Sequence, residues 1–284
     1  LRSQRLWGRM TNSNFGKLKN QSEVVSKMFR FYIEGFYRMD NFTVLKRIES
    51  LRKRNTNNPN AINKHLYRLI CNTEILQLAY GKMKSKPGNM TPGIEEETLD
   101  GYSIKIIERT LEDLRAQTFQ FKPVRRVEIP KTVELRQTTE NTGKTRPLGV
   151  PSPRDKVVQQ AMLMIMEAIY EPTFSNLSHG FRPGRSCHSA LREYRKYWSG
   201  MKWVIEGDIK GCYDNIDHQV LITLLRKKIQ DERFIQLVWK LLRAGTQINK
   251  IYSPTKLGTP QGGILSPLLA NVYLNEFDYF IENL

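Results

Sequence analysis

The sequence predicts an α+β fold in which long helices dominate and antiparallel strands are few and short. Over most of the chain, apolar residues recur every three or four positions, as they do in helices with one buried face. Apolar and polar residues alternate only in short stretches, such as 124–131 and 203–209, as in strands. The 284 residues suffice for one large domain or two moderate ones.

Basic residues outnumber acidic ones by 45 to 28, which gives a formal net charge of +17. This charge points to a polyanionic partner, either nucleic acid or an anionic membrane surface. The sequence contains no run of eighteen apolar residues and no lipid-anchor motif. We therefore expect nucleic acid, and not a membrane, as the partner.

The positive charge is concentrated at the front of the chain. Residues 1–60 hold thirteen basic and four acidic residues, a net charge of +9. Residues 1–80 are predicted to form a basic helical extension, with helices over 22–39, 44–54 and 61–80. The second helix ends in three consecutive basic residues, Arg52, Lys53 and Arg54, which we expect to bind an RNA backbone. A solvated basic arm would have the same composition.

An exposed basic loop is predicted over 82–92, because three lysines alternate there with two prolines and a glycine. A helix is expected next, over 99–118. A hairpin should follow, with one strand over 124–131, a tip over 138–145 and a returning strand over 146–150. The loop is either a contact site for a polyanion, through Lys84 and Lys86, or a plain connector.

The second half of the chain is predicted to alternate helices with two short strands. Helices are expected over 157–170, capped by Asp155, and over 186–198. A central strand over 201–209 comes next, then helices over 217–229 and 231–245, with Gly245 as a stop. A short strand over 247–253 leads to a glycine-rich loop and a last helix over 266–283, for which Ser266 should be the N-cap.

Asp208 lies where the predicted central strand ends. Trp203, Ile205 and Ile209 share one face of that strand, and Gly207 and Gly211 bracket its end. A carboxylate in such a place can hold a hard cation, which phosphoryl transfer needs to neutralise phosphate charge and to activate the attacking oxygen. The alternative is that Asp208 merely caps the turn that follows.

Four blocks of the sequence together resemble a known family, the reverse transcriptases encoded by group II introns, which are also called intron maturases. Two blocks resemble its motif A (203–214) and motif B (258–271), and two more match in the family's order (146–159 and 179–186). The resemblance covers the chain from about residue 40 to its end. It implies the fingers and an incomplete palm of a right-hand polymerase. It implies fingers over 81–160, with a template-contacting loop and a hairpin, and fingers and palm over 161–284.

The resemblance also implies roles for individual residues. Asp208 would be catalytic and, with the backbone carbonyl of Ile209, would hold Mg²⁺ in a two-ion site. The nucleotide would meet Arg125, Lys131, Tyr213, Gln261 and Gly262. Tyr213 would be the steric gate that excludes a 2′ hydroxyl. Each role has a plain alternative: Arg125 and Lys131 as solvated surface bases, Tyr213 as a core aromatic, Gln261 as a turn residue.

Two arginines flank the Pro183-Gly184 turn in the block over 179–186. Arg182 and Arg185 either contact RNA phosphates or brace the neighbouring helix through carboxylates. The sequence leaves the two interpretations equally open.

One departure from the family concerns its third catalytic block, which contains two adjacent aspartates downstream of motif B. No Asp-Asp pair occurs in this sequence, which ends just after the motif B helix. We therefore expect a fragment that lacks the second metal-binding carboxylate and the thumb, and that does not polymerise by itself.

The function implied is that of a group II intron's RNA-directed DNA polymerase, which also binds intron RNA to assist splicing and mobility. Alternatives are an RNA-binding maturase without polymerase activity and an RNA-dependent RNA polymerase, which Tyr213 disfavours. The implied partners are intron RNA, an RNA template with a DNA primer, dNTP and, for the longer protein, a DNA target. We expect a cytoplasmic bacterial ribonucleoprotein, and leave open a mitochondrial origin and a homodimer.

Overall fold

The computed structural model describes residues 42–284 except 136–137, 199 and 261. The helix predicted over 22–39 lies outside the described residues. The chain divides into two units between Arg47 and Ile48, and the domain boundaries predicted at 80 and 160 stay predictions. Within the described ranges, no helix is both long enough and apolar enough to cross a membrane.

Helix α7 (Pro153–Tyr170) forms the centre of the larger unit. Fourteen of its eighteen residues are buried, so the helix is covered on all sides, as expected of a core helix. It begins four residues before the predicted start, with Pro153 in the first turn, where its missing N–H costs nothing. The prediction that Asp155 caps this helix is wrong, because Asp155 lies inside the first turn and Ser152 is the N-cap.

The described residues of the first half of the chain form the helices α3 (Phe42–Asn57), α4 (Leu66–Ile70), α5 (Thr73–Lys84) and α6 (Ile104–Arg115). Of these, α4 and α5 pack against α7. The single helix predicted over 61–80 is wrong: the chain breaks before α5, where the Asn72 side chain accepts a hydrogen bond from Glu74 N and starts a new helix. The helix predicted over 99–118 begins later, after the 3₁₀ turn η2 (Leu99–Gly101).

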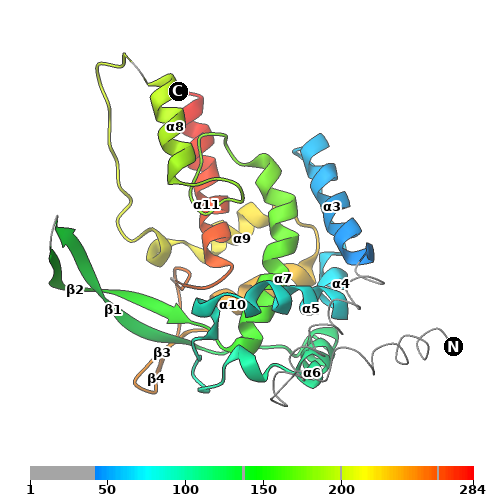
Figure 1. Ribbon diagram of the computed structural model, residues 1–284. Helices are drawn as coiled ribbons and strands as arrows, with labels where there is room; N and C mark the ends of the chain where they lie inside the picture. The colour runs from blue at the N-terminus through cyan, green and yellow to red at the C-terminus, as the bar shows by residue number, and fades with distance from the viewer. Residues whose placement is uncertain (1–41, 136–137, 199, 261) are drawn as a thin grey trace, which may run out of the picture. The chain divides into compact units, whose positions relative to one another are not determined.

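A four-stranded sheet lies beside these helices in the order β2-β1-β3-β4. The strands are β1 (Val124–Leu135), β2 (Thr138–Val150), β3 (Thr246–Ile248) and β4 (Ile251–Ser253). Neighbours pair antiparallel except β1 and β3, which pair in parallel. Figure 1 shows the β1–β2 hairpin extending away from the helices.

Two details of the predicted strands need correction. Residues 138–145 do not form the tip of the first hairpin, because they belong to β2, which pairs with β1 from Thr138 onward. The strand predicted over 247–253 is a tight hairpin of β3 and β4, whose turn places Asn249 and Lys250 at positive φ.

The last four helices are α8 (Cys187–Tyr197), α9 (His218–Arg226), α10 (Glu232–Leu242) and α11 (Ser266–Glu282). Asp217 and Asp231 cap α9 and α10 by accepting hydrogen bonds from backbone N–H groups, as their positions predict. The N-cap predicted at Ser266 is wrong: Leu265 is the N-cap, and the Ser266 hydroxyl donates to Pro260 O.

The central strand predicted over 201–209 is absent from the structure. Residues 201–210 are exposed throughout, with Trp203 at 87% and Ile205 at 98% of their full accessibility. Figure 1 shows this segment running alone between α8 and α9. A strand exists only where its backbone groups pair with a neighbour, and no described strand lies beside this segment. The helix-rich α+β class is confirmed, with the sheet built from other residues.

Candidate active site and nucleic-acid contacts

The exposed segment delivers Asp208 to a tight turn. Gly211 has a φ of +62° and starts the 3₁₀ turn η4 (Cys212–Asn215). The Asn215 side chain closes this turn by donating to Lys210 O and Gly211 O, both at 3.1 Å. Asp208 has no hydrogen-bond partner among the described residues and is exposed. Asn215, and not Asp208, therefore caps the turn, and the Asp208 carboxylate is open to solvent.

The glycine-rich loop of motif B packs directly on the turn that follows Asp208. Thr259 N donates to Tyr213 O and Gly258 N donates to Ile216 O, both at 2.8 Å. Gly258 has a φ of +83°, and a Cβ atom there would lie 2.7 Å from Tyr213 O and from Asp214 O. Only glycine fits this contact, so the two motifs meet through backbone atoms.

The same loop also contacts β2 and α7. Gly262 has a φ of +98°, and a Cβ atom there would lie 2.7 Å from Gly149 O of β2. Ile264 N donates to the Gln159 side chain of α7 at 3.0 Å. Three blocks that lie far apart in the sequence are therefore in contact. Gln261, between them, lies outside the described residues.

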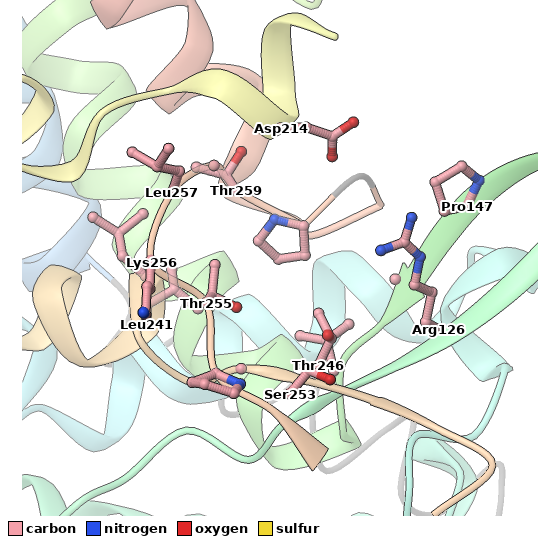
Figure 2. Close-up of a pocket in the computed structure, with 17 residues that line it drawn as sticks. Arg126, Pro147, Asp214, Leu241, Thr246, Ser253, Thr255, Lys256, Leu257 and Thr259 are labelled. Atoms are coloured by element: carbon pink, nitrogen blue, oxygen red, sulfur yellow. The ribbon is translucent and has the colours of Figure 1, made fainter. Parts of the chain in front are cut away.

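A cavity of about 370 Å³ lies between the fingers sheet and the motif B loop. Figure 2 shows Arg126 and Pro147 of the hairpin on one side, with Asp214 and Thr259 across from them. Charged and hydroxyl groups line it: Arg126, Asp214, Thr246, Ser253, Thr255, Lys256 and Thr259. The arrangement suits a polar, charged ligand next to the motif A turn.

The arginine of β1 that lines this cavity is Arg126, which sequence reasoning missed. Successive side chains of a strand point to opposite faces, and the predicted Arg125 lies on the other face. Its guanidinium donates to Pro92 O, from Nε at 3.1 Å and Nη2 at 2.8 Å. The alternation of side chains along β1 was the signal that could have shown which of the two arginines faces the cavity. Lys131 also lies on β1.

Tyr213 is half-buried within η4. Burial raises the pKa of its phenol, so the ring stays neutral at physiological pH. Its backbone carbonyl is engaged by Thr259. The role of Tyr213 as a steric gate stays a prediction.

The two-ion Mg²⁺ site that the resemblance implies can be compared with the carboxylates of the described residues. Asp208 offers one carboxylate, and the carbonyl of Ile209 follows it. Within the described ranges, no group of three or more Asp, Glu, His or Cys side chains gathers around one point. Two magnesium ions held 3.5–4 Å apart, as a rough general separation, need carboxylates from more than one segment. The described residues alone therefore do not form a complete two-ion site.

Several of the basic residues predicted to bind RNA lie in one region. Burial raises the pKa of the Glu167 carboxyl on α7, while the positive charges of Lys82, Arg52 and Lys86 act in the opposite direction. Basic residues from α3, from α5 and from the loop after α5 therefore all lie close enough to Glu167 to affect its pKa. Lys53, Arg54 and Lys84 are exposed on the same elements.

The arginines of the 179–186 block have different surroundings. Arg182 is 7% exposed, and its guanidinium contacts Glu171 Oε1 at 3.0 Å and the carbonyls of Ser175 and Ser178. It braces the turn after α7, as the second of the two interpretations states. Arg185 is half-exposed and donates to Asn176.

The chain is similar in sequence to a family of known proteins. The profile of the family "Reverse transcriptase (RNA-dependent DNA polymerase)" matches residues 129–283. An uncharacterized 91 kDa protein in a cob intron of Schizosaccharomyces pombe is 49% identical over 85% of this chain and 29% of its own length. The group II intron-encoded protein LtrA of Lactococcus lactis is 45% identical over 84% of this chain and 38% of its own.

A putative COX1/OXI3 intron 2 protein of Saccharomyces cerevisiae is 41% identical over 86% of this chain and 28% of its own length. Among solved structures, a partial Cas6-RT-Cas1–Cas2 complex matches 77% of this chain and 35% of its own, with a TM-score of 0.48 and 24% identity. The chain thus spans 28–38% of the length of these intron-encoded relatives. By its profile match and its intron-encoded relatives, it belongs to the reverse transcriptase family, among the group II intron-encoded reverse transcriptases and maturases.

Proposed function

We propose that this chain forms the fingers and part of the palm of a group II intron's RNA-directed DNA polymerase, which transfers nucleotides along an RNA template with Mg²⁺. The hydrogen-bonded junction between the motif A turn and the motif B loop carries this proposal. In this junction, the turn that follows the exposed Asp208 packs on a glycine-rich loop that also contacts β2, which supports the proposal.

The proposed roles follow from the chemistry of each side chain. Asp208 and the carbonyl of Ile209 would hold Mg²⁺, which neutralises phosphate charge and activates the primer hydroxyl when bound. Lys131 would meet the triphosphate with a point charge, and the planar fork expected of Arg125 would come from Arg126, which lines the cavity while Arg125 holds Pro92 O. Tyr213 would exclude a 2′ hydroxyl, and the tract Gln261-Gly262 would lie beside the new base pair.

The isolated chain should not polymerise. It offers one catalytic carboxylate where two ions need more, and the segment that carries it is exposed and unpaired. We expect no primer extension when the chain is mixed with an RNA template, a DNA primer, dNTP and Mg²⁺. Extension by the chain that disappears in the Asp208→Asn variant would contradict this. Extension that persists in Asp208→Asn would identify a contaminating polymerase.

The chain should nevertheless bind structured intron RNA through its basic surface. The logarithm of the association constant should fall linearly with the logarithm of the salt concentration, because bound counterions are released. Changing Arg52, Lys53 and Arg54 to glutamine should make this slope shallower by about 0.9 for each phosphate that the variant no longer neutralises. The control changes Arg226 and Lys227, which pair with Glu232 and Glu276, to glutamine. Equal slopes in both variants would remove the α3 bases from the interface.

The further partners belong to the same proposal: intron RNA for splicing and mobility, an RNA template with a DNA primer, a DNA target for the longer protein, and a second copy of the chain. The relatives include a group II intron-encoded protein of the bacterium Lactococcus lactis and an intron maturase of Arabidopsis thaliana whose name includes "mitochondrial". We therefore infer a ribonucleoprotein of the bacterial cytoplasm or of a mitochondrion.

A further inference from the structure

The loop that precedes the fingers is attached to the core through three backbone carbonyls. Lys156 Nζ, on the first turn of α7, donates to Asn89 O at 2.8 Å and to Thr91 O at 2.6 Å. Arg125, on β1, donates twice to Pro92 O. Two cations from different elements therefore hold one four-residue stretch of the loop, which includes the end of the 3₁₀ turn η1 (Pro87–Met90).

Lys156 is an unusual residue to hold a loop from inside the core. It is 3% exposed, and no carboxylate among the described residues pairs with it. Burial, together with the nearby Arg125 guanidinium, lowers the pKa of its amine to about 8. A buried charge costs free energy unless its hydrogen bonds are made. An apolar side chain of the same length would avoid this cost, so the amine is explained by what it holds.

Other contacts fix the path of the loop on either side. A Cβ atom on Gly93 would lie 2.7 Å from the backbone of Ser152, the N-cap of α7, so the chain passes there in direct contact. The Asn89 side chain donates back to Met83 O at 3.3 Å. Glu95, just beyond, pairs with Lys122. The loop therefore cannot slide along α7 without breaking several of these interactions at once.

The held stretch lies a few residues after two exposed lysines: Lys84, the last residue of α5, and Lys86, which precedes η1. Lys86 and Lys82 act on Glu167 together with Arg52. The hydrogen bonds from Lys156 and Arg125 therefore fix where the first lysines of the loop lie relative to the other basic residues.

We propose that Lys156 is a positioning residue for single-stranded RNA: it holds the backbone of residues 89–92 so that Lys84 and Lys86 meet the template phosphates in one arrangement. This rests on the proposed function, together with the template contact that the resemblance implies for the loop. Lys156 itself touches no RNA. It acts by preorganising the loop, which lowers the entropic cost of binding.

The test measures the binding of a single-stranded RNA oligonucleotide over a salt series, and hydrogen exchange of the loop amides, in the full 284-residue chain. Lys156→Met should weaken binding about tenfold at fixed salt, because the loop must be ordered on binding. Its salt slope should equal that of the wild type, because the same phosphates are neutralised in both proteins. Exchange at residues 89–93 should accelerate. Lys156→Arg, which keeps a donor, should restore both.

The control is Lys228→Met. Burial also lowers the pKa of the Lys228 amine to about 8, but this amine has no hydrogen-bond partner among the described residues and lies over the Tyr170 ring instead. The variant should leave RNA affinity and loop exchange unchanged. Should Lys156→Met not fold, Gly93→Ala displaces the same loop from the Ser152 side without a change of charge, and the same tenfold weakening, as a rough expectation, with an unchanged slope should follow.

The outcomes separate this inference from the function on which it rests. Faster loop exchange with wild-type affinity would overturn the positioning role. Weaker binding together with a shallower slope would show direct phosphate contact by Lys156 and would also overturn it. The Lys84→Gln/Lys86→Gln double variant should make the slope shallower by about 1.4, at about 0.7 for each phosphate of a single strand. If this double variant binds like the wild type, the loop does not contact the template, and the proposed function fails at that point instead.

Discussion

The base of the fingers and the segment 201–210 carry similar sequence signals but have opposite surroundings. Around α7 and the start of β1, apolar side chains are buried, and the cations Lys156 and Arg125 are fully engaged. In the segment, Ile205 is 98% exposed and Asp208 has no hydrogen-bond partner among the described residues. The segment that carries Asp208 is thus less supported by packing than the region around α7.

The difference comes from where each strand finds its partner. The strand β1 pairs with β2, which begins three residues after β1 ends, so little chain entropy is lost when the ladder closes. Residues 203–209 have the alternation of a strand but no adjacent hairpin partner. Alternation predicts which faces a strand will have, and it cannot supply a neighbour.

The largest effect is expected at the buried arginine of the packed region. Arg182→Met leaves Glu171 buried without its cation, so unfolding free energy should fall by about 3–5 kcal/mol. Arg185→Met, at the half-exposed arginine of the same block, should cost less than about 1 kcal/mol. Urea unfolding measures both. Equal losses would show that burial does not separate the two arginines.

Two isoleucines compare the regions directly. Ile165 of α7 is fully buried, and Ile165→Ala should cost about 3–4 kcal/mol through reduced burial and the cavity left behind. Ile205→Ala should change the stability of this chain by less than about 0.5 kcal/mol, because its side chain touches mostly water. A large destabilisation at Ile205 in the same urea titration would mean that the segment has a packing partner in solution.

Two glycines make the same comparison for the backbone. A Cβ atom on Gly258 would overlap the carbonyls of Tyr213 and Asp214 at a φ of +83°, so Gly258→Ala should cost about 2–3 kcal/mol. Gly207 has no atom within 4 Å of such a Cβ, and Gly207→Ala should be neutral within about 0.5 kcal/mol. Thermal unfolding of the two variants checks this. A Gly258→Ala variant as stable as the wild type would show that motifs A and B are not in close backbone contact.

The smallest effect is a pH dependence at the start of α7. Burial raises the pKa of Asp155 from 3.8 to about 6, although Lys122 N donates to its carboxylate. A raised pKa means that Asp155 contributes stability below about pH 4 and that this contribution is lost as the pH rises through 6.

Asp155→Asn can keep the bond from Lys122 N without the charge. It should match the wild type at pH 4 and exceed its unfolding free energy by about 2 kcal/mol at pH 7. Urea titrations at the two pH values measure this difference. A constant difference between the proteins would assign the effect to another group.

Local signals in the sequence predicted much of the helical framework. Asp217, Asp231 and Ser186 cap helices at the positions where their side chains can accept backbone hydrogen bonds. Asn72 shows the limit of such signals, because its cap divides a stretch that apolar periodicity alone predicts as one helix.

At the candidate site, the sequence predicted a glycine-rich loop, and the structure added that Gly258 and Gly262 make close backbone contacts with the motif A turn and with β2. It did not predict that Arg125 reaches Pro92 while Arg126 lines the cavity. Two adjacent arginines are equivalent in composition, and the strand's orientation in the sheet decides between them.

By itself, the sequence determined the family, the helix-rich class and the glycine-rich loop, since each of these depends on residues close together in the chain. The tertiary structure alone decided which cations became buried braces, such as Lys156 and Arg182, and which stayed exposed. It also decided that residues 201–209 lack a strand partner among the described residues. Burial and pairing depend on neighbours brought together from distant positions, and a local pattern contains no information about which neighbours those are.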